Sequence, residues 1–293
     1  VLVPQTVWNE KRAEDLESWL AKADSCGAVG VDMDAAFSVL SHEMERGSGA
    51  LLLHHTGKTE ISVRPVDERT PSDISLMEQA HAAGGFAEIE KPWWPEAHIG
   101  LALGGDLVGI ANNHFTYSSY LPERARERAE FRKDYPPGAH GYALYCFDLW
   151  YAYLNCGFRA SPTAGSASGV LPNPPGYNRV YVRLDGPFSY DAWFRGLVAG
   201  RSFVTNGPML FATVNGVAPG DTVTTLSADR FVEVACEVRS PEPIEKVEIV
   251  RNGSVIQTFT NPSMTNDTFV TQARVPVNGT CWIAARCFEK RED

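Results

Sequence analysis

The chain has 293 residues, of which 44% are hydrophobic, and a formal net charge of -10 at pH 7. This length predicts about two domains, each able to bury a core, and the apolar content excludes a disordered chain. The acidic balance disfavours a nucleic-acid binder, and the densest basic stretch, residues 124–134, interleaves acids with its arginines as a solvated helix does. No segment approaches the run of about 18 apolar residues that crosses a bilayer.

The chain opens on VLVPQTVW, without a methionine and with the composition of a strand interior. We therefore expect it to begin inside a longer gene product, so that a periplasmic, secreted or cytoplasmic location all stay open. Six cysteines occur without a C-x-x-C pair, so the sequence does not support a zinc knuckle. Most of these cysteines are expected to be small buried hydrophobes.

The first two thirds of the chain alternate helical and strand-like segments. Apolar spacing predicts a helix over residues 11–26, and a short apolar run follows at 50–55 and ends in two histidines. Residues 72–83 begin with a Ser or Asp cap and stop at a glycine pair, which predicts a second helix. The segment after it, residues 86–92, alternates as a strand and ends at a proline.

The same alternation continues with a strand over 107–114, an aromatic helix over 142–157, a strand at VYVRLDG and a helix in DAWFRGLVAG. Helix, strand and polar loop in succession are typical of an α/β barrel or a doubly wound sheet. After about residue 207 the segments become alternating strands, with a hairpin around Asn252-Gly253. The sequence therefore predicts an α/β domain over 1–206 and a small all-β, Ig-like sandwich over 207–293.

Histidines stand at the ends of two predicted strands, His54 after the apolar run and His114 after the strand that begins at residue 107. Taken alone, each is more often a hydrogen-bonded structural histidine than a catalytic one. The carboxyl ends of barrel strands, however, are where barrel active sites form. No H-E-x-x-H or H-x-H motif occurs in the sequence, so it contains no strong metal motif.

A second group of polar residues follows the strand that starts at residue 86. If the strand is real, Glu88 and Glu90 share one face, and buried carboxylates there need a cation, either Lys91 or a metal. The alternative is a surface strand with its glutamates outward and with Trp93 and Trp94 closing the rim. Adjacent tryptophans before a proline also suit a platform for sugars or aromatic ligands.

The small-residue run at Gly165–Gly169 resembles a nucleophile elbow at first sight. That motif, G-x-S-x-G, places serine at its third position. Here the run reads G-S-A-S-G and its third position is Ala167, so the serine-hydrolase elbow is excluded by register.

Several motifs of the chain occur together in one known family: Ala-Gly-Gly before a strand ending in P-W-W-P-E, then LNCGFR, TAGSASG and RVYVRLDGPFSYDAWFRGLVAGRSFVTNGP. With them the chain resembles the carbaryl-hydrolase-like branch of the PHP (polymerase and histidinol phosphatase) metallohydrolases. The resemblance covers roughly residues 1–210 and is strongest from Asn155 to Pro208. It implies a distorted (β/α)7 barrel with divalent metals, zinc, manganese or iron, at the strand ends, which activate water to hydrolyse phosphoesters or carbamate-like esters.

The sequence departs from that family at its metal ligands, and the family's opening H-x-H strand has no counterpart in this chain. Glu90-Lys91-Pro92 stands where the family has Ala-His-Pro with a ligating histidine. Ala167 and Gly169 stand where the family has a ligating Asp and His, and neither has a side-chain donor atom. We therefore expect an altered or lost metal site in which the ammonium of Lys91 replaces the cation.

The resemblance and the residues together favour a hydrolase of ester or phosphoester bonds, with Lys91, Glu90 and His114 as its catalytic residues. If a metal remains, His54 and Glu43 are the expected ligands, beside Glu90 and His114. The alternative is a catalytically inert ligand-binding or scaffold protein. Nucleic-acid processing, known for polymerase-associated PHP domains, is disfavoured by the acidic charge.

In either case the expected partner is a small molecule, and amides, hydroxyls and aromatic rings in one pocket suit a polyol, a sugar or a small carboxylate. The residues expected to bind it are Trp93, Trp94, Asn112, Asn113, Ser166, Ser168, Asn173, Tyr177 and Arg179.

Overall fold

The computed structural model describes residues 2–8, 21, 28–32, 36–47, 49–59, 61–67, 69–94, 97–115, 134–136, 138–168, 171–225 and 230–290. The chain divides into two compact units. The first consists of Val1–Ile110, Phe158–Ser161 and Leu184–Val198, and the second of Ala111–Gly157, Pro162–Arg183 and Ala199–Asp293. The helix predicted over 11–26 and the basic segment 124–134 lie almost wholly outside the described residues.

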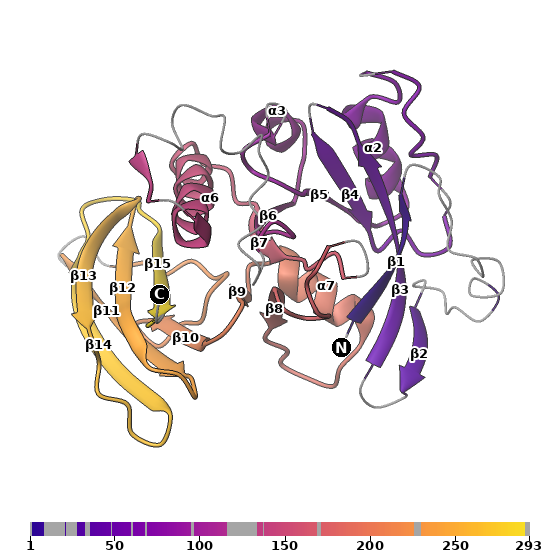
Figure 1. Ribbon diagram of the computed structural model, residues 1–293. Coiled ribbons are helices and arrows are strands. Elements are labelled where there is room, and N and C mark those ends of the chain that lie inside the picture. Colours follow the sequence, from indigo (N-terminus) through magenta and orange to yellow (C-terminus); the bar gives the residue numbers. More distant parts are fainter. Residues whose placement is uncertain are drawn as a thin grey trace. The chain divides into compact units, whose positions relative to one another are not determined.

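The largest sheet has seven strands, in the order β1-β3-β4-β5-β6-β7 with β2 beside β3 (Figure 1). The pairs β1–β3 and β5–β6 are parallel, whereas β2–β3, β3–β4 and β4–β5 are antiparallel. The strands are β1 (Leu2–Trp8), β2 (Ala28–Asp32), β3 (Ala36–Glu45), β4 (Ala50–His54), β5 (Phe86–Ile89), β6 (Leu107–Ala111) and β7 (Ser161–Ala164).

The predicted PHP-like (β/α)7 barrel, and any TIM-like barrel, is therefore wrong. Such a barrel needs parallel strands, each followed by a helix, in a sheet that closes on itself. The described strands instead form an open, mixed sheet that ends at β1 and β7. A tight turn between β3 and β4, closed by a 2.8 Å bond from the Arg46 amide to the Gly49 carbonyl, reverses the chain where a barrel would have a helix.

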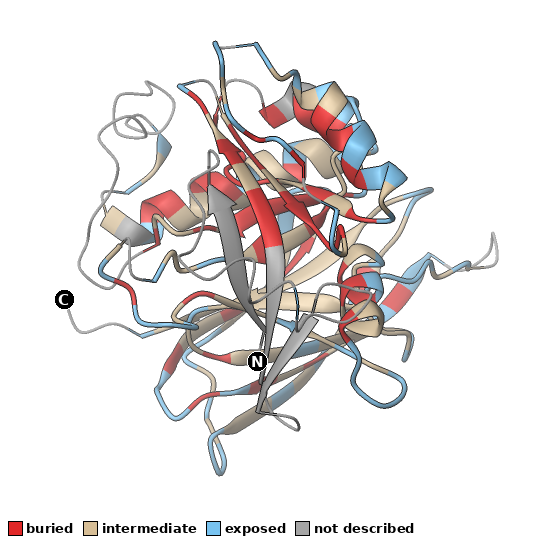
Figure 2. Cartoon of the chain, turned by 90° about the vertical axis from the view of Figure 1, so that its right-hand side faces the viewer, coloured by how far each residue is buried: buried red, intermediate tan, exposed pale blue. Residues whose placement is uncertain are grey.

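The helix α2 (Asp73–Ala82) confirms the helix predicted over residues 72–83. Its N-cap is Ser72, whose hydroxyl accepts a hydrogen bond from the Ser75 amide and so satisfies a free backbone donor of the first turn. Leu76, Met77 and Ala80 lie on one buried face, and α2 packs with β4 and β5. Buried residues gather along the strands and on this face of the helix (Figure 2).

The other described helices are α3 (Ala97–Ala102), α6 (Gly138–Asn155) and α7 (Tyr190–Val198). The last two correspond to the aromatic helix predicted over 142–157 and to the helix predicted in DAWFRGLVAG, and they confirm both. None of the described helices combines the length and the hydropathy that a membrane-spanning helix needs.

The C-terminal part of the second unit consists of antiparallel strands. One sheet has the order β10-β11-β14 and another the order β13-β12-β15, while β8 pairs with β9. Val234 and Cys236 of one sheet share a core with Ile249 of the other, so the two three-stranded sheets form two packed layers. The strands are β8 (Arg179–Val182), β9 (Ser202–Thr205), β10 (Met209–Val214), β11 (Phe231–Arg239), β12 (Ile244–Arg251), β13 (Ser254–Thr260), β14 (Thr268–Pro276) and β15 (Ile283–Glu289).

The hairpin predicted around Asn252-Gly253 is confirmed as the turn between β12 and β13. Both central residues have positive φ, 49° at Asn252 and 85° at Gly253. A two-residue turn with this conformation matches the right-handed twist of the flanking strands, and Asn-Gly is the dipeptide that adopts it most readily.

Candidate functional site

Three polar side chains of the first unit form a continuous chain of hydrogen bonds across β3, β4 and β5. Ser41 Oγ lies 2.9 Å from His54 Nδ1, and His54 Nε2 lies 3.0 Å from Glu88 Oε2. A carboxylate only accepts hydrogen bonds, so Glu88 favours the tautomer with the proton on Nε2. In that tautomer Nδ1 accepts the proton of the Ser41 hydroxyl.

The strand register explains why these residues meet. Ser41 pairs directly with His54 across β3 and β4, and Glu88 of β5 pairs with Leu52, two residues before His54. Because side chains alternate between the faces of a sheet, all of these residues lie on one face, together with Glu43. On the opposite face lie Leu53 and Ala87, which are apolar, and His42, which is polar, and all three are buried.

Glutamates crowd this polar face. Burial, and then the neighbouring carboxyl of Glu90, raise the pKa of Glu43 to about 8, with further contributions from Glu45 and Glu88. Burial likewise raises the pKa of Glu90, although the adjacent Lys91 opposes the shift. Glu43 therefore holds a proton at neutral pH, and the cluster contains both a proton donor and a base.

Lys91 and Glu90 form a buried ion pair directly after β5. The Lys91 ammonium also lies 4.2 Å from the centre of the Trp94 ring, which is a cation–π contact. Trp93 and Trp94 are themselves 4% and 7% exposed and pack edge to face, with ring centroids 5.5 Å apart. Trp94 thus holds the lysine in the interior, and the faces of the two buried tryptophans do not form an exposed platform.

The metal centre that the family resemblance implies does not fit these side chains as they are arranged. Both ring nitrogens of His54 face protein partners, and Glu90 is paired with Lys91. Within the described part of the chain, no three His, Cys, Asp or Glu side chains come together as a set of metal ligands. A fixed ammonium beside the carboxylates supplies positive charge there without a metal.

His55 follows His54 but faces a different environment. Its Nε2 lies 3.0 Å from Asp191 Oδ1 of α7, and its ring lies nearly parallel to those of Phe86 and Phe194, with centroids 5.9 Å and 5.6 Å away. Phe194 also lies against His54, with centroids 5.5 Å apart. The helix α7 therefore covers the end of the polar face at which the serine and the histidine lie.

The remaining expected binding residues belong to the second unit, where side-chain amides tie three loops together. Asn178 Nδ2 donates toward the carbonyls of Asn112, Phe115 and Gly165, at 3.0, 2.9 and 3.0 Å. The Ser166 hydroxyl accepts from the Asn178 amide at 3.0 Å and lies 3.1 Å from its carbonyl. Such bonds to loop carbonyls fix the loop conformation.

Asn112, Asn113 and His114 form the first of these loops. Asn112 is buried, and its Oδ1 accepts from the Tyr142 hydroxyl at 2.9 Å and from the His114 amide at 3.1 Å. The carbonyl of Asn113 accepts from Asn173 Nδ2 at 3.1 Å. This loop is positioned by its own amides, and His114 lies in the second unit, whereas Glu90 and its neighbours lie in the first.

The small-residue run and the loop after it are placed as follows. Ser168 is exposed, Ala167 has a positive φ of 44°, and Gly169 lies outside the described residues. The Arg179 guanidinium donates to the carbonyls of Gly176 and Gly207, at 3.1 and 3.0 Å. Arg179 therefore braces the backbone of its own loop.

Reasoning from the sequence missed two central residues, Ser41 and Asn178. The signal for Ser41 was its position two residues before Glu43, since both then share a face if the segment is a strand. Asn178 carries no signal in the sequence, because its partners are backbone carbonyls of distant loops. No known protein family, curated protein or solved structure matches this chain.

Proposed function

We propose that the first unit is a hydrolase of ester or phosphoester bonds that works by a serine nucleophile and acid–base groups. The observation that carries the proposal is the hydrogen-bonded chain Ser41–His54–Glu88. A nucleophile bonded to a base, which is oriented in turn by a third group, is the arrangement that serine hydrolases use on unrelated folds.

Each group has a chemical role in this proposal. Ser41 Oγ attacks the carbonyl carbon or the phosphorus while its proton passes to His54 Nδ1, and Glu88 stabilises the imidazolium at Nε2. The protonated Glu43, two residues from Ser41 on the same face, donates a proton to the leaving alcohol. Water then attacks the ester formed on Ser41 and gives a proton to the Glu43 carboxylate, while the His54 imidazolium returns its proton to Ser41 Oγ, so that all three groups regain their starting protonation states.

The Lys91–Glu90 pair supplies the fixed charge beside these groups. In the resemblance to the PHP family, Lys91 occupies the position of a metal-ligating histidine. Its ammonium stabilises negative charge that develops on the substrate oxygen, which is the role that a metal ion plays in metallohydrolases. The reaction proposed for this chain therefore continues in the presence of a chelator.

A second function, that of an inert scaffold without catalysis, is favoured by burial. Ser41 is 1% exposed and Lys91 is 2% exposed. A substrate reaches Ser41 only if the side chains above it, including Phe194 of α7, move aside. If they do not, the polar groups serve to specify the packing of the sheet, and the chain is an inert relative of an enzyme.

The test measures release of p-nitrophenol from p-nitrophenyl acetate and p-nitrophenyl phosphate, with a chelator or with added manganese or zinc. The expected result is turnover that resists the chelator and falls by about 100-fold or more in kcat/KM for Ser41→Ala. Because Glu43 must keep its proton, the rate also falls above about pH 8, and this limb disappears in Glu43→Gln.

Ser62→Ala is the matched control, since Ser62 is an exposed serine of the same unit. Turnover that requires an added metal and survives Ser41→Ala contradicts the serine mechanism and supports a metal-dependent one. Absence of turnover with both substrates in the folded protein contradicts the hydrolase and leaves the inert scaffold.

A further inference from the structure

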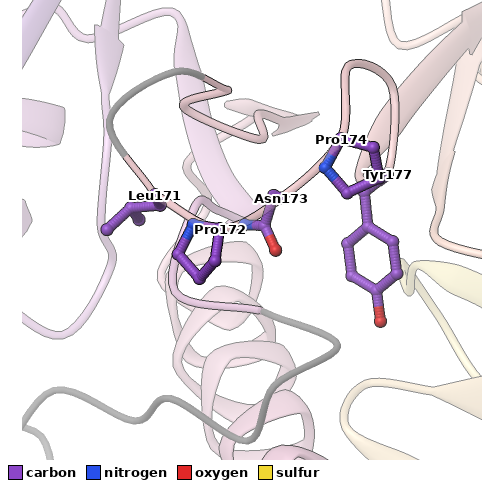
Figure 3. Close-up of a pocket in the computed structure, with 5 residues that line it drawn as sticks. All are labelled: Leu171, Pro172, Asn173, Pro174 and Tyr177. Atoms are coloured by element: carbon purple, nitrogen blue, oxygen red, sulfur yellow. The ribbon is translucent and has the colours of Figure 1, made fainter.

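The loop that joins the small-residue run to β8 forms an open pocket in the second unit. Its volume is about 580 Å³, and its lining residues are Leu171, Pro172, Asn173, Pro174 and Tyr177 (Figure 3). Four of these side chains present apolar surface. Among the lining residues none is charged, so the pocket suits a neutral ligand of small-molecule size.

The one amide in the pocket has a fixed orientation. Asn173 Nδ2 lies 3.1 Å from the carbonyl of Asn113, 3.3 Å from that of Phe115 and 3.1 Å from that of Ser166. Three acceptors around this atom identify it as the NH2 group, because a flipped amide would place its oxygen against three carbonyl oxygens. The amide oxygen of Asn173 therefore points away from these three carbonyls.

That oxygen is an acceptor without a donor. Asn173 is 4% exposed, and its Oδ1 receives no hydrogen bond from the part of the chain that the structure describes. Figure 3 shows the amide oxygen on the same side of the loop as the rings of Pro172 and Tyr177. A buried acceptor left unsatisfied is destabilising, and a ligand N–H or O–H that reaches it removes this penalty.

We infer that this pocket binds a small aromatic ring that carries one N–H or O–H donor. The flat faces of the prolines and of Tyr177 provide apolar contact for the ring, and Asn173 Oδ1 accepts the donor. The amide is held in place before the ligand arrives, so binding requires little ordering of this group. This site is separate from the proposed hydrolase site, since its residues belong to the other unit.

The test compares two probes that differ in one hydrogen-bond donor, indole and 1-methylindole, by titration calorimetry or saturation-transfer NMR on the full chain. Indole is expected to bind, and 1-methylindole, which has no N–H, to bind roughly 2–10-fold more weakly, as expected for one hydrogen bond. Equal affinity for the two probes contradicts the role of Asn173. No binding of either probe up to its solubility overturns the pocket.

Variants place the binding within the loop. Tyr177→Ala is expected to weaken both probes by about fivefold or more, because it removes a wall of the pocket. Tyr181→Ala is the control, since Tyr181 is an exposed aromatic residue of the same unit that does not line the pocket. Equal losses in the two variants refute the assignment. Indole binding that persists in Ser41→Ala shows that ligand binding in this pocket does not depend on the proposed hydrolase site.

Discussion

Replacement of Glu43 by glutamine is expected to remove a large part of the alkaline sensitivity of the first unit. The carboxyl has a pKa near 4.5 when unfolded and about 8 in the folded protein. Between these values the folded state binds the additional proton, so the free energy of unfolding falls as the pH rises. With about 1.4 kcal/mol for each pKa unit, the loss from pH 6 to pH 9 amounts to about 3 kcal/mol.

Glu43→Gln keeps the shape of the side chain and cannot ionise, so its stability is expected to stay nearly level over this range. Urea unfolding followed by tryptophan fluorescence measures the difference, since Trp93 and Trp94 are buried in the same unit. Glu78→Gln is the matched control, because Glu78 is exposed on α2. If the variant loses stability with pH as steeply as the wild-type protein, burial does not hold a proton on Glu43 in the folded state.

Two further changes probe the histidine and the amides. Burial, and then the charge of His54, lower the pKa of His42 to about 4. The unfolded state therefore binds the additional proton between about pH 6.5 and 4, and His42→Gln is expected to retain about 3 kcal/mol that the wild-type protein loses over this range in urea unfolding. Asn178→Ala removes three carbonyl contacts and is expected to destabilise the second unit by about 2–4 kcal/mol in the same assay.

For each of these two substitutions, one result would contradict the prediction. A His42→Gln protein that unfolds in acid as the wild type does shows that the ring is protonated in the folded state. For the amide cluster the control is Asn206→Ala, an exposed asparagine, whose effect is expected to stay within about 0.5 kcal/mol. If Asn178→Ala behaves like it, the loops are held by other contacts.

Local signals in the sequence were sufficient for single elements. The serine cap before α2 and the Asn-Gly turn between β12 and β13 act over a few residues, and the structure confirms both. These signals depend on hydrogen bonds and φ preferences that need no distant partner. They say nothing of the direction in which neighbouring strands run.

The barrel was predicted wrongly because the relative direction of neighbouring strands depends on pairing between distant segments and not on local signals. The segment from Ala36 to Glu45 contains the polar run Ser-His-Glu and shows no regular alternation of polar with apolar residues, and it was not recognised as the strand β3. Ser41 and Glu43 lie on one face of this strand, where the Ser41 hydroxyl bonds to His54 of β4. A strand with carboxylates on its inner face lacks the hydrophobic pattern by which strands are found.

The candidate site shows the same limit. Glu90, Lys91 and His54 were selected from the sequence, and the structure places them in one unit with Glu43. Ser41 joins them only through the register between β3 and β4. A shift of one residue in that register would turn Ser41 to the opposite face, so no pattern within a single strand reveals the hydrogen-bonded chain.

The two units are each assembled from separate stretches of the chain, and this has a consequence for synthesis and for truncation. The helix α7, which covers His54 and His55, leaves the ribosome about a hundred residues after β5. Until then the aromatic and histidine side chains at that end of the sheet lack the cover that α7 provides. A fragment that stops at Ile110 contains most of the first unit and yet exposes its aromatic surface, so we expect it to aggregate.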